Sequence, residues 1–316
     1  KFFFNKLYMY IELMNDIGID VKVKNSITYF SSYTHKTWLV RIIGIIFYWM
    51  INKDFRVELS FKSLNQLEKQ LLFCIKNNLY NLNIPCKSYL RNKDLIESVK
   101  FIKDLDKRFD IIPHYSLFYQ YELNINKSYQ KLSKFLAYLN EINIKEILLV
   151  SGTNKKKKFD TLDVLSSELL INNKHNNQSI GIAYNPYFTN NNKSLERERF
   201  LQKIKNKNVH SIWLQFGTDI NLLDKEITFL HKNIKNNKNK VKIYGSFFIP
   251  SRQFIARFKF RPWKGVFISN EYLDSIYEAN AISREISDIY NNNNIIHLIE
   301  SSISSDKDME RFNQFM

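Results

Sequence analysis

The sequence is poor in the residues that break or cross-link a chain: its 316 residues include two cysteines, seven glycines and five prolines. The cysteines, Cys74 and Cys86, are too few for the disulfide framework of a small secreted domain and leave no zinc-like cluster. No glycine-rich dinucleotide-binding fingerprint is present. The most apolar run, residues 39–51, is interrupted by Arg41 and is shorter than the roughly 20 residues that cross a bilayer. We therefore expect this run to be a buried or interfacial segment, with no transmembrane span.

We expect no signal peptide in these residues, because no charged segment is followed by an apolar core and a small-residue cleavage site. We expect an intracellular protein, either cytoplasmic or organellar. Hydrophobic residues make up 44% of the chain, with 25 Phe and 18 Tyr, which is enough for a sizeable core. The net charge of +16 favours phosphate-rich partners, but the lysines at 155–158 and 232–242 are typical of solvated loops in an AT-rich coding sequence. Nucleic-acid binding is therefore not expected.

From residue 56 onward, short β-branched or aromatic runs alternate with longer amphipathic ones. The expected strands are 56–61, 80–86, 110–116, 146–151, 179–184, 209–216, 241–249 and 295–300. The expected helices are 64–76, 94–107, 128–142, 162–170, 195–205, 219–234, 252–258, 272–290 and a last one beginning at 309. The asparagine runs at 190–192 and 291–294 are interpreted as loop expansions.

This alternation indicates a mostly parallel sheet, either open and doubly wound or closed as a barrel. Eight units without a dinucleotide fingerprint favour an α/β fold of the (β/α)8 barrel type. Residues 1–55 do not fit the repeat, so we expect an N-terminal extension over 1–55 and the barrel over 56–316.

The active site of such a barrel forms at the carboxyl ends of its strands. Glu58 lies in an otherwise apolar strand, where burial would raise its pKa and make it a usable acid near neutral pH. Gln215 lies between Leu214 and Phe216, and its buried amide would need partners for both oxygen and nitrogen, which a heterocycle could provide. The other polar positions at strand ends are His114, Gly152 with Thr153, Tyr184 to Pro186, Ser251 to Gln253, and His297. We interpret His297 as a core histidine.

Four stretches in this order resemble the methylenetetrahydrofolate reductase family: RVELSF at 56–61, DIIPHYS at 110–116, EILLVSGT at 146–153 and IWLQFGTD at 212–219. The segment 242–258 is similar to the family's seventh strand and following helix. The resemblance extends over about 56–305 and lies in the order of the motifs more than in any one of them.

The resemblance implies an FAD-dependent oxidoreductase of one-carbon metabolism and methionine biosynthesis, in which FAD takes a hydride from NAD(P)H and passes it to 5,10-methylenetetrahydrofolate. Glu58 would be the general acid that helps to open the folate's imidazolidine ring. Gln215 would hold the pterin, and Phe254 would stack on the ring in the shared site. The residues implied to line the flavin are His114, Gly152, Thr153, Tyr184 and Lys203. The choice between NADH and NADPH, and whether the chain forms a homo-oligomer, stay open.

Two departures from the family pattern keep a second hypothesis open. Thr153 stands where the family has an acidic residue close to the flavin, and Lys62 and Ser63 replace the proline-rich turn after the first-strand glutamate. The alternative is a non-catalytic or flavin-free barrel that acts as a folate-binding or assembly module. A flavin-free methyltransferase domain is a related alternative.

Overall fold

The chain divides into two compact units, residues 1–53 and residues 54–316. In this computed structural model, the described residues are 21–24, 27–30, 55–87, 92–122, 124–152, 159–167, 178–235, 240–301, 305–313 and 315. In the first unit, β1 (Val21–Lys24) and β2 (Ile27–Phe30) pair antiparallel. The apolar run at 39–51, for which we predicted a buried or interfacial segment, lies outside the described residues.

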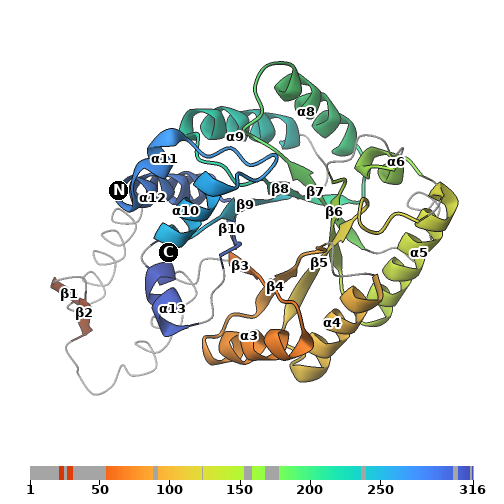
Figure 1. Cartoon of the computed structure of the whole chain (residues 1–316), viewed down its shortest axis with the longest axis horizontal. Helices are drawn as coiled ribbons and strands as arrows, with labels where there is room; N and C mark the ends of the chain where they lie inside the picture. Colours follow the sequence, from red (N-terminus) through yellow and green to blue (C-terminus); the bar gives the residue numbers. More distant parts are fainter. Residues whose placement is uncertain are drawn as a thin grey trace. The chain divides into compact units, whose positions relative to one another are not determined.

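The second unit is a closed, parallel eight-stranded barrel with helices around it (Figure 1), which confirms the predicted (β/α)8 fold. Consecutive strands are neighbours, and β10 closes the ring by pairing with both β9 and β3. The strands are β3 (Phe55–Glu58), β4 (Asn81–Ile84), β5 (Asp110–Ser116), β6 (Glu146–Val150), β7 (Ser179–Tyr184), β8 (Val209–Leu214), β9 (Lys242–Phe247) and β10 (Ile296–Ile299).

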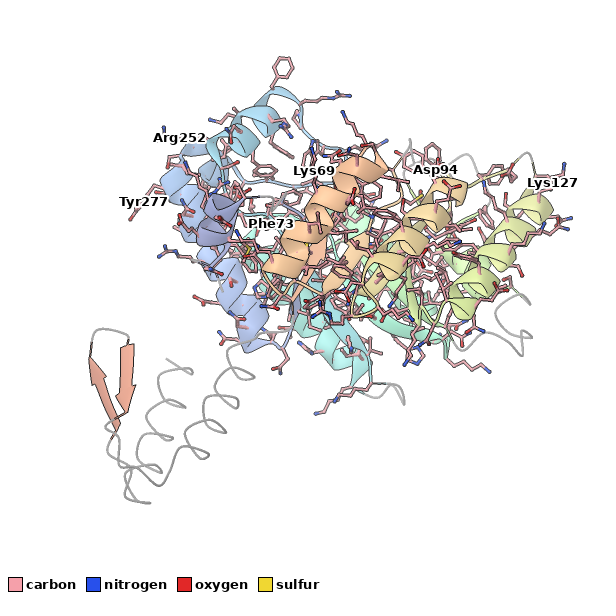
Figure 2. The ribbon with its side chains drawn as sticks, turned by 90° about the horizontal axis from the view of Figure 1, so that it is seen from below. Lys69, Phe73, Asp94, Lys127, Arg252 and Tyr277 are labelled. Carbon is pink, nitrogen blue, oxygen red and sulfur yellow. The ribbon has the colours of Figure 1, made fainter. Side chains whose placement is uncertain are left out.

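The helices form the outer layer, and Figure 2 shows α3, α4 and α5 side by side on the outside of the barrel, marked by Lys69, Asp94 and Lys127. In the described part of the chain, no helix is both long and apolar enough to cross a membrane. The helices are α3 (Leu64–Lys76), α4 (Asn92–Leu105), α5 (Ile125–Glu141), α6 (Thr161–Leu165), α8 (Asn190–Lys203), α9 (Ile220–Ile234), α10 (Arg252–Phe260), α11 (Asn270–Asp274), α12 (Ile276–Asn292) and α13 (Asp306–Asn313).

Two expectations about local structure were wrong. The asparagine run at 190–192 forms the first turn of α8 after the N-cap Thr189, and 291–292 belongs to the end of α12. The helix expected over 272–290 is divided into α11 and α12, because Ser275 is extended and its hydroxyl caps α12 by accepting a hydrogen bond from the Glu278 backbone N–H. Helix capping therefore depends on side-chain bonds that apolar periodicity does not reveal.

Asparagine replaces glycine at three helix ends in this glycine-poor chain. Asn78, Asn143 and Asn294 have φ angles of 57°, 57° and 55°, and each follows the C-cap residue of α3, α5 or α12. This position commonly requires the left-handed conformation, which asparagine adopts more readily than other residues with a side chain. Each of the three helices can therefore turn back to the next strand without a glycine.

Side chains fill the inside of the barrel. Trp213 from β8 and Tyr244 from β9 stack with ring centroids 3.9 Å apart and planes 12° from parallel. Ile112, Leu148 and Leu298 pack with them in one buried cluster. The barrel is thus closed by packed rings and aliphatic groups, and the space for a ligand lies beyond this layer, at the strand ends.

Candidate active site

A cavity of about 720 Å3 opens at the carboxyl ends of the strands. Glu58 ends β3, Lys87 follows β4, Phe248 follows β9 and Glu300 follows β10. Segments after β9 and β10, including α10 and α13, supply the rest of its lining: Ile249, Ser251, Gln253, Phe254, Arg257, Trp263, Ser301, Asp308 and Arg311, with Ser60 after β3. In a barrel of this type, these strand ends are where active sites are built.

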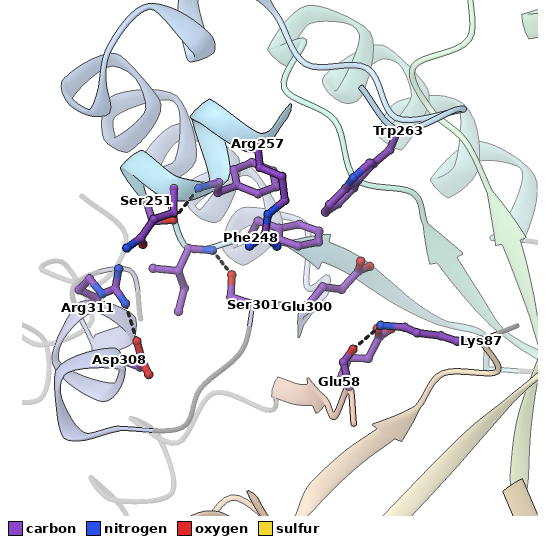
Figure 3. Close-up of a pocket in the computed structure, with 14 residues that line it drawn as sticks. Glu58, Lys87, Phe248, Ser251, Arg257, Trp263, Glu300, Ser301, Asp308 and Arg311 are labelled. Carbon is purple, nitrogen blue, oxygen red and sulfur yellow. Dashed lines mark hydrogen bonds and ion pairs between the residues drawn. The ribbon is translucent and has the colours of Figure 1, made fainter. Parts of the chain in front are cut away.

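Glu58 and Glu300 are neighbours across the seam that closes the barrel. Strands β3 and β10 run parallel, with Leu298 opposite Arg56 and Ile299 opposite Val57, so the next level brings Glu300 opposite Glu58. Adjacent strands lie about 4.8 Å apart, and side chains at one level of the ladder point to the same face. Both carboxyl groups therefore reach the same cavity (Figure 3).

The Glu58 carboxyl is enclosed, and its side chain is only 11% exposed. Burial, and next the charge of Glu300, raise its pKa to about 8, while the charge of Lys87 and a hydrogen bond from Ser60 oppose the shift. Lys87 Nζ lies 3.9 Å from Glu58 Oε1 and donates to the Ser60 hydroxyl. A carboxyl with this pKa is protonated at neutral pH and can act as a general acid.

The pKa of Glu300 is also raised, first by burial, while a hydrogen bond from the Ser246 hydroxyl and the charge of Lys87 lower it. Two carboxyl groups at one level in a desolvated cavity do not both ionise readily. The pair therefore holds a proton near neutral pH, and its apparent pKa values belong to the pair.

A chain of hydrogen bonds orients His114 toward Glu58. Arg56 Nε donates to Asn83 Oδ1 over 2.6 Å, which leaves the Asn83 Nδ2 group to donate to His114 Nε2 over 2.8 Å. Since Nε2 accepts, the ring proton of neutral His114 is on Nδ1, which lies 3.9 Å from Glu58 Oε2. Burial, and then the charges of Arg56 and Lys87, lower the pKa of His114 to about 3. His114 is therefore neutral and does not compete with Glu58 for a proton.

Three aromatic side chains form one wall of the cavity. Phe248 and Phe254 stack with centroids 5.1 Å apart and planes 15° from parallel, and Trp263 packs edge-on against Phe254 at 5.7 Å. All three are half-buried, so part of each ring faces the cavity. Such a wall favours a planar ligand, which can stack on the rings. Phe254 was predicted to stack on a ring in this site, and its place in the wall is compatible with that role.

The rim of the cavity is cationic. Arg257 of α10 is exposed, and within the described ranges its guanidinium makes no hydrogen bond or ion pair. Arg311 of α13 is paired with Asp308, and both line the cavity (Figure 3). The cavity thus runs from acidic groups at the strand ends, along an aromatic wall, to a positively charged opening. No cluster of three or more potential metal ligands is found among the described side chains.

A second, smaller cavity of about 270 Å3 adjoins the first, because Lys87 lines both. His114 and Gly152, both predicted to contact a cofactor, lie in its wall together with Pro85, Cys86, Ser116, Phe118, Tyr119 and Val150. Gly152 has a φ of +80°, and a Cβ atom there would come within 2.5 Å of Phe118 Cβ. Glycine is therefore required here by both conformation and space.

Tyr184 and Lys203 lie away from both cavities. The Tyr184 hydroxyl donates to the buried carboxylate of Glu226 on α9, which also pairs with Arg197. Lys203 is buried at the end of α8, and its amine donates to the Ala183 carbonyl over 3.4 Å. In this structure, both side chains hold helices against the barrel.

The other residues singled out in the sequence each have a different environment. Gln215, predicted to hold a pterin, is half-buried just beyond β8, lines neither cavity, and accepts a bond from the Phe216 backbone N–H at 3.0 Å. His297, interpreted as a core histidine, is 1% exposed and bonded to the Ser287 hydroxyl. Thr153 lies outside the described residues.

Three residues of the site were not predicted from the sequence: Glu300, Lys87 and Asn83. Glu300 ends the segment IIHLIE, which was predicted as a strand, and a carboxyl in a mainly apolar strand is the same signal that identified Glu58. Asn83 is in NLNI, a strand in which polar residues conceal the apolar pattern. Lys87 is in a loop, and its position depends on how the chain leaves β4, which periodicity does not predict.

No protein-family model matches this chain, and no curated protein matches it in sequence. Similar solved structures include an uncharacterised protein from Clostridium thermocellum that binds two copies of 5-methyl-5,6,7,8-tetrahydrofolic acid. It is 13% identical, with a TM-score of 0.55 over 83% of this chain and 92% of that chain. Xanthomonas albilineans dihydropteroate synthase is 11% identical, with a TM-score of 0.46 over 83% and 92%. N-acetylneuraminate lyase from Mycoplasma synoviae is 17% identical, with a TM-score of 0.40 over 72% and 73%. At 13% identity, the Clostridium protein shares the barrel fold with this chain.

Proposed function

We propose that the larger cavity binds a reduced folate and that Glu58 is the general acid for a reaction at its one-carbon unit. The proposal rests on how the types of side chain are arranged along the cavity: carboxyl groups lie at the strand ends, aromatic rings in the wall, and arginines at the opening. A folate has the matching order, with a pterin head rich in N–H donors, an aromatic linker and an anionic glutamate tail. The volume of about 720 Å3 is within the usual range for small-molecule sites.

The role of Glu58 follows from its protonation. Its pKa of about 8 keeps the proton on the carboxyl at neutral pH, and neutral His114 at 3.9 Å does not remove it. Opening the imidazolidine ring of 5,10-methylenetetrahydrofolate breaks a carbon–nitrogen bond, and the departing nitrogen takes up a proton. A positioned acid typically accelerates such a step by about 10²–10⁴-fold.

The finer form of the proposal is FAD-dependent reduction of 5,10-methylenetetrahydrofolate to 5-methyltetrahydrofolate with NAD(P)H, as the family resemblance implies. His114 and Gly152 lie in the wall of the smaller cavity, and they would contact the flavin ring there. FAD would supply the hydride. Tyr184 and Lys203 are engaged with Glu226 and Ala183, so the rest of the dinucleotide would have to bind elsewhere on the barrel rim.

A flavin-free folate-binding barrel is the second candidate. The engagement of Tyr184 and Lys203 favours it, because these side chains are not directed toward either cavity. The barrel of similar fold from Clostridium thermocellum binds a methylated reduced folate, which supports the choice of ligand for both candidates.

An absorbance spectrum of the purified protein, before and after addition of FAD, separates the two candidates. The reductase predicts a flavin spectrum that bleaches when NADH or NADPH is added without oxygen and returns when methylenetetrahydrofolate follows. Glu58→Gln should still bleach but regain its colour about 10²–10⁴ times more slowly. Glu68→Gln, an exposed carboxyl of α3, is the matched control and should behave as the wild type.

Protein that stays colourless after addition of FAD but binds 5-methyltetrahydrofolate would leave the flavin-free candidate. Protein that binds neither FAD nor any folate would contradict the proposed function in both forms.

A further inference from the structure

Glu300 has bonding capacity that the protein does not use. The Ser246 hydroxyl donates to its Oε1 atom, and within the described chain no other side-chain or backbone donor is bonded to this carboxyl. An ionised carboxyl can accept about four hydrogen bonds, and one in a desolvated cavity is destabilised when it has few donors. The unused acceptor positions adjoin the cavity that Glu300 lines.

The backbone fixes where Glu300 points. Its N–H donates to the Phe247 carbonyl of β9 over 3.0 Å, and β10 pairs with β9 up to Ile299 and Phe247. Ser246 belongs to the same strand β9, so both the main chain and the carboxyl of Glu300 are held by one neighbour. In Figure 3, the side chain extends between Glu58 with Lys87 on one side and Phe248 with Trp263 on the other.

The two carboxyl groups differ in their surroundings. Among the effects that favour the ionised form of Glu300, the direct hydrogen bond from the Ser246 hydroxyl is the largest, whereas for Glu58 the charge of Lys87 at 3.9 Å comes first and the hydrogen bond from Ser60 is the smallest. A hydrogen bond to the ionised form stabilises that form. When one proton is shared between them, the arrangement therefore favours the proton on Glu58 and the negative charge on Glu300.

From this geometry, we infer that Glu300 is the recognition residue for a flat heterocycle that presents two adjacent N–H donors, such as the N3–H and 2-amino edge of a pterin. The inference rests on the proposed function, because it assigns the head of the folate to this carboxyl. Two parallel N–H···O bonds to one carboxylate are short and directional, so they discriminate against an edge that lacks one donor. The aromatic wall of Phe248, Phe254 and Trp263 is placed to cover the face of the same heterocycle.

Pterin and lumazine test this assignment, because lumazine carries an oxygen where pterin has the 2-amino group. Binding of both to the full chain is measured by the change in their fluorescence and by competition with 5-methyltetrahydrofolate. The wild type should bind pterin at least about tenfold more tightly than lumazine. Glu300→Gln should lose or reverse this preference, because its amide can accept from N3–H and donate to the 2-oxo group of lumazine.

Two further variants separate recognition from structural damage. Ser246→Ala removes the hydroxyl donor that favours the ionised form of Glu300 but keeps the carboxyl, so the preference for pterin should weaken without reversing. Glu310→Gln, at an exposed carboxyl of α13 outside the cavity, should leave both affinities unchanged. The circular dichroism and melting temperature of each variant are compared with the wild type to confirm folding.

Equal wild-type affinities for pterin and lumazine would overturn the inference, as would a folded Glu300→Gln that keeps the preference for pterin. If 5-methyltetrahydrofolate still binds in either case, the proposed function stands and the assignment of Glu300 alone fails. If no folate and no pterin binds the wild type, the proposed function fails and the inference fails with it.

Discussion

Glu300 lies opposite Glu58 on the neighbouring parallel strand, so the seam between β10 and β3 brings two carboxyl groups to one level of the barrel mouth. Burial raises the pKa of both groups. Their pairing is a feature of the closed barrel, because the two residues are 242 positions apart in the sequence.

The free energy of unfolding should fall with rising pH because of this pair. Between about pH 4.5 and pH 8, folded Glu58 keeps a proton that the unfolded chain releases. The folded state then binds more protons than the unfolded state, and stability decreases with a slope of up to about 1.4 kcal/mol per pH unit for each retained proton. Urea unfolding at several pH values measures the slope.

The titration of His114 changes the free energy of unfolding in the opposite direction, so it limits the pH range in which the effect of Glu58 can be measured alone. Its pKa is lowered from 6.5 to about 3, so its contribution to stability increases with pH over that range and is complete above it. The decline due to Glu58 should therefore be clearest between about pH 6.5 and pH 8. Glu58→Gln should flatten the curve in this window, and Glu68→Gln should not. A wild-type stability that stays level or rises there would show that Glu58 is ionised in the folded protein.

The tautomer of His114 should depend on Asn83. Asn83→Asp replaces the amide that donates to His114 Nε2 with an acceptor, so Nε2 should become protonated and the pKa of His114 should rise by more than about one unit above its value near 3. Nuclear magnetic resonance titration of the histidine ring protons measures the change. Asn81→Asp, on the same strand but bonded to the Phe55 carbonyl, is the control and should have a smaller effect. An unchanged His114 titration in Asn83→Asp would contradict the assigned hydrogen-bond direction.

The fold could be predicted from the sequence because strands and helices have different periods. Strands 110–116 and 179–184 and the helix 64–76 have the bounds that apolar periodicity indicated. Two residues that line the candidate cavity were singled out beforehand: Glu58 as a carboxyl in an apolar strand, and Phe254 through the family resemblance. The partnership of Glu58 with Glu300 could not be predicted, because it depends on the register at which the last strand meets the first.

Arg257 should bind the anionic tail of a folate. Its exposed guanidinium lines the cavity, and a charge-assisted bond to a carboxylate is among the stronger hydrogen bonds. Arg257→Ala should weaken binding of 5-methyltetrahydrofolate about tenfold and leave the affinity for pterin, which has no tail, unchanged. Lys259→Ala removes an exposed charge from the same helix outside the cavity and is the matched control. Equal losses for folate and pterin would show that Arg257 acts on the fold and not on the tail.

Asn143 should be replaceable by glycine but not by alanine. Its φ of 57° is in the left-handed region, where a side chain without a local polar group costs about 1–2 kcal/mol. Asn143→Ala should therefore lower the free energy of unfolding by about 1 kcal/mol, and Asn143→Gly should leave it nearly unchanged. Urea denaturation of the three proteins provides the comparison. An alanine variant as stable as the glycine variant would remove the conformational explanation.

Calorimetric titration of the wild-type protein with 5-methyltetrahydrofolate shows whether the larger cavity binds a reduced folate. We expect saturable binding with a Kd on the order of micromolar, and about a tenfold weaker Kd for Phe254→Ala, which removes one ring from the cavity wall. Absence of saturable binding to folded wild-type protein, or an unchanged Kd in folded Phe254→Ala, would contradict the assignment of this cavity to a reduced folate.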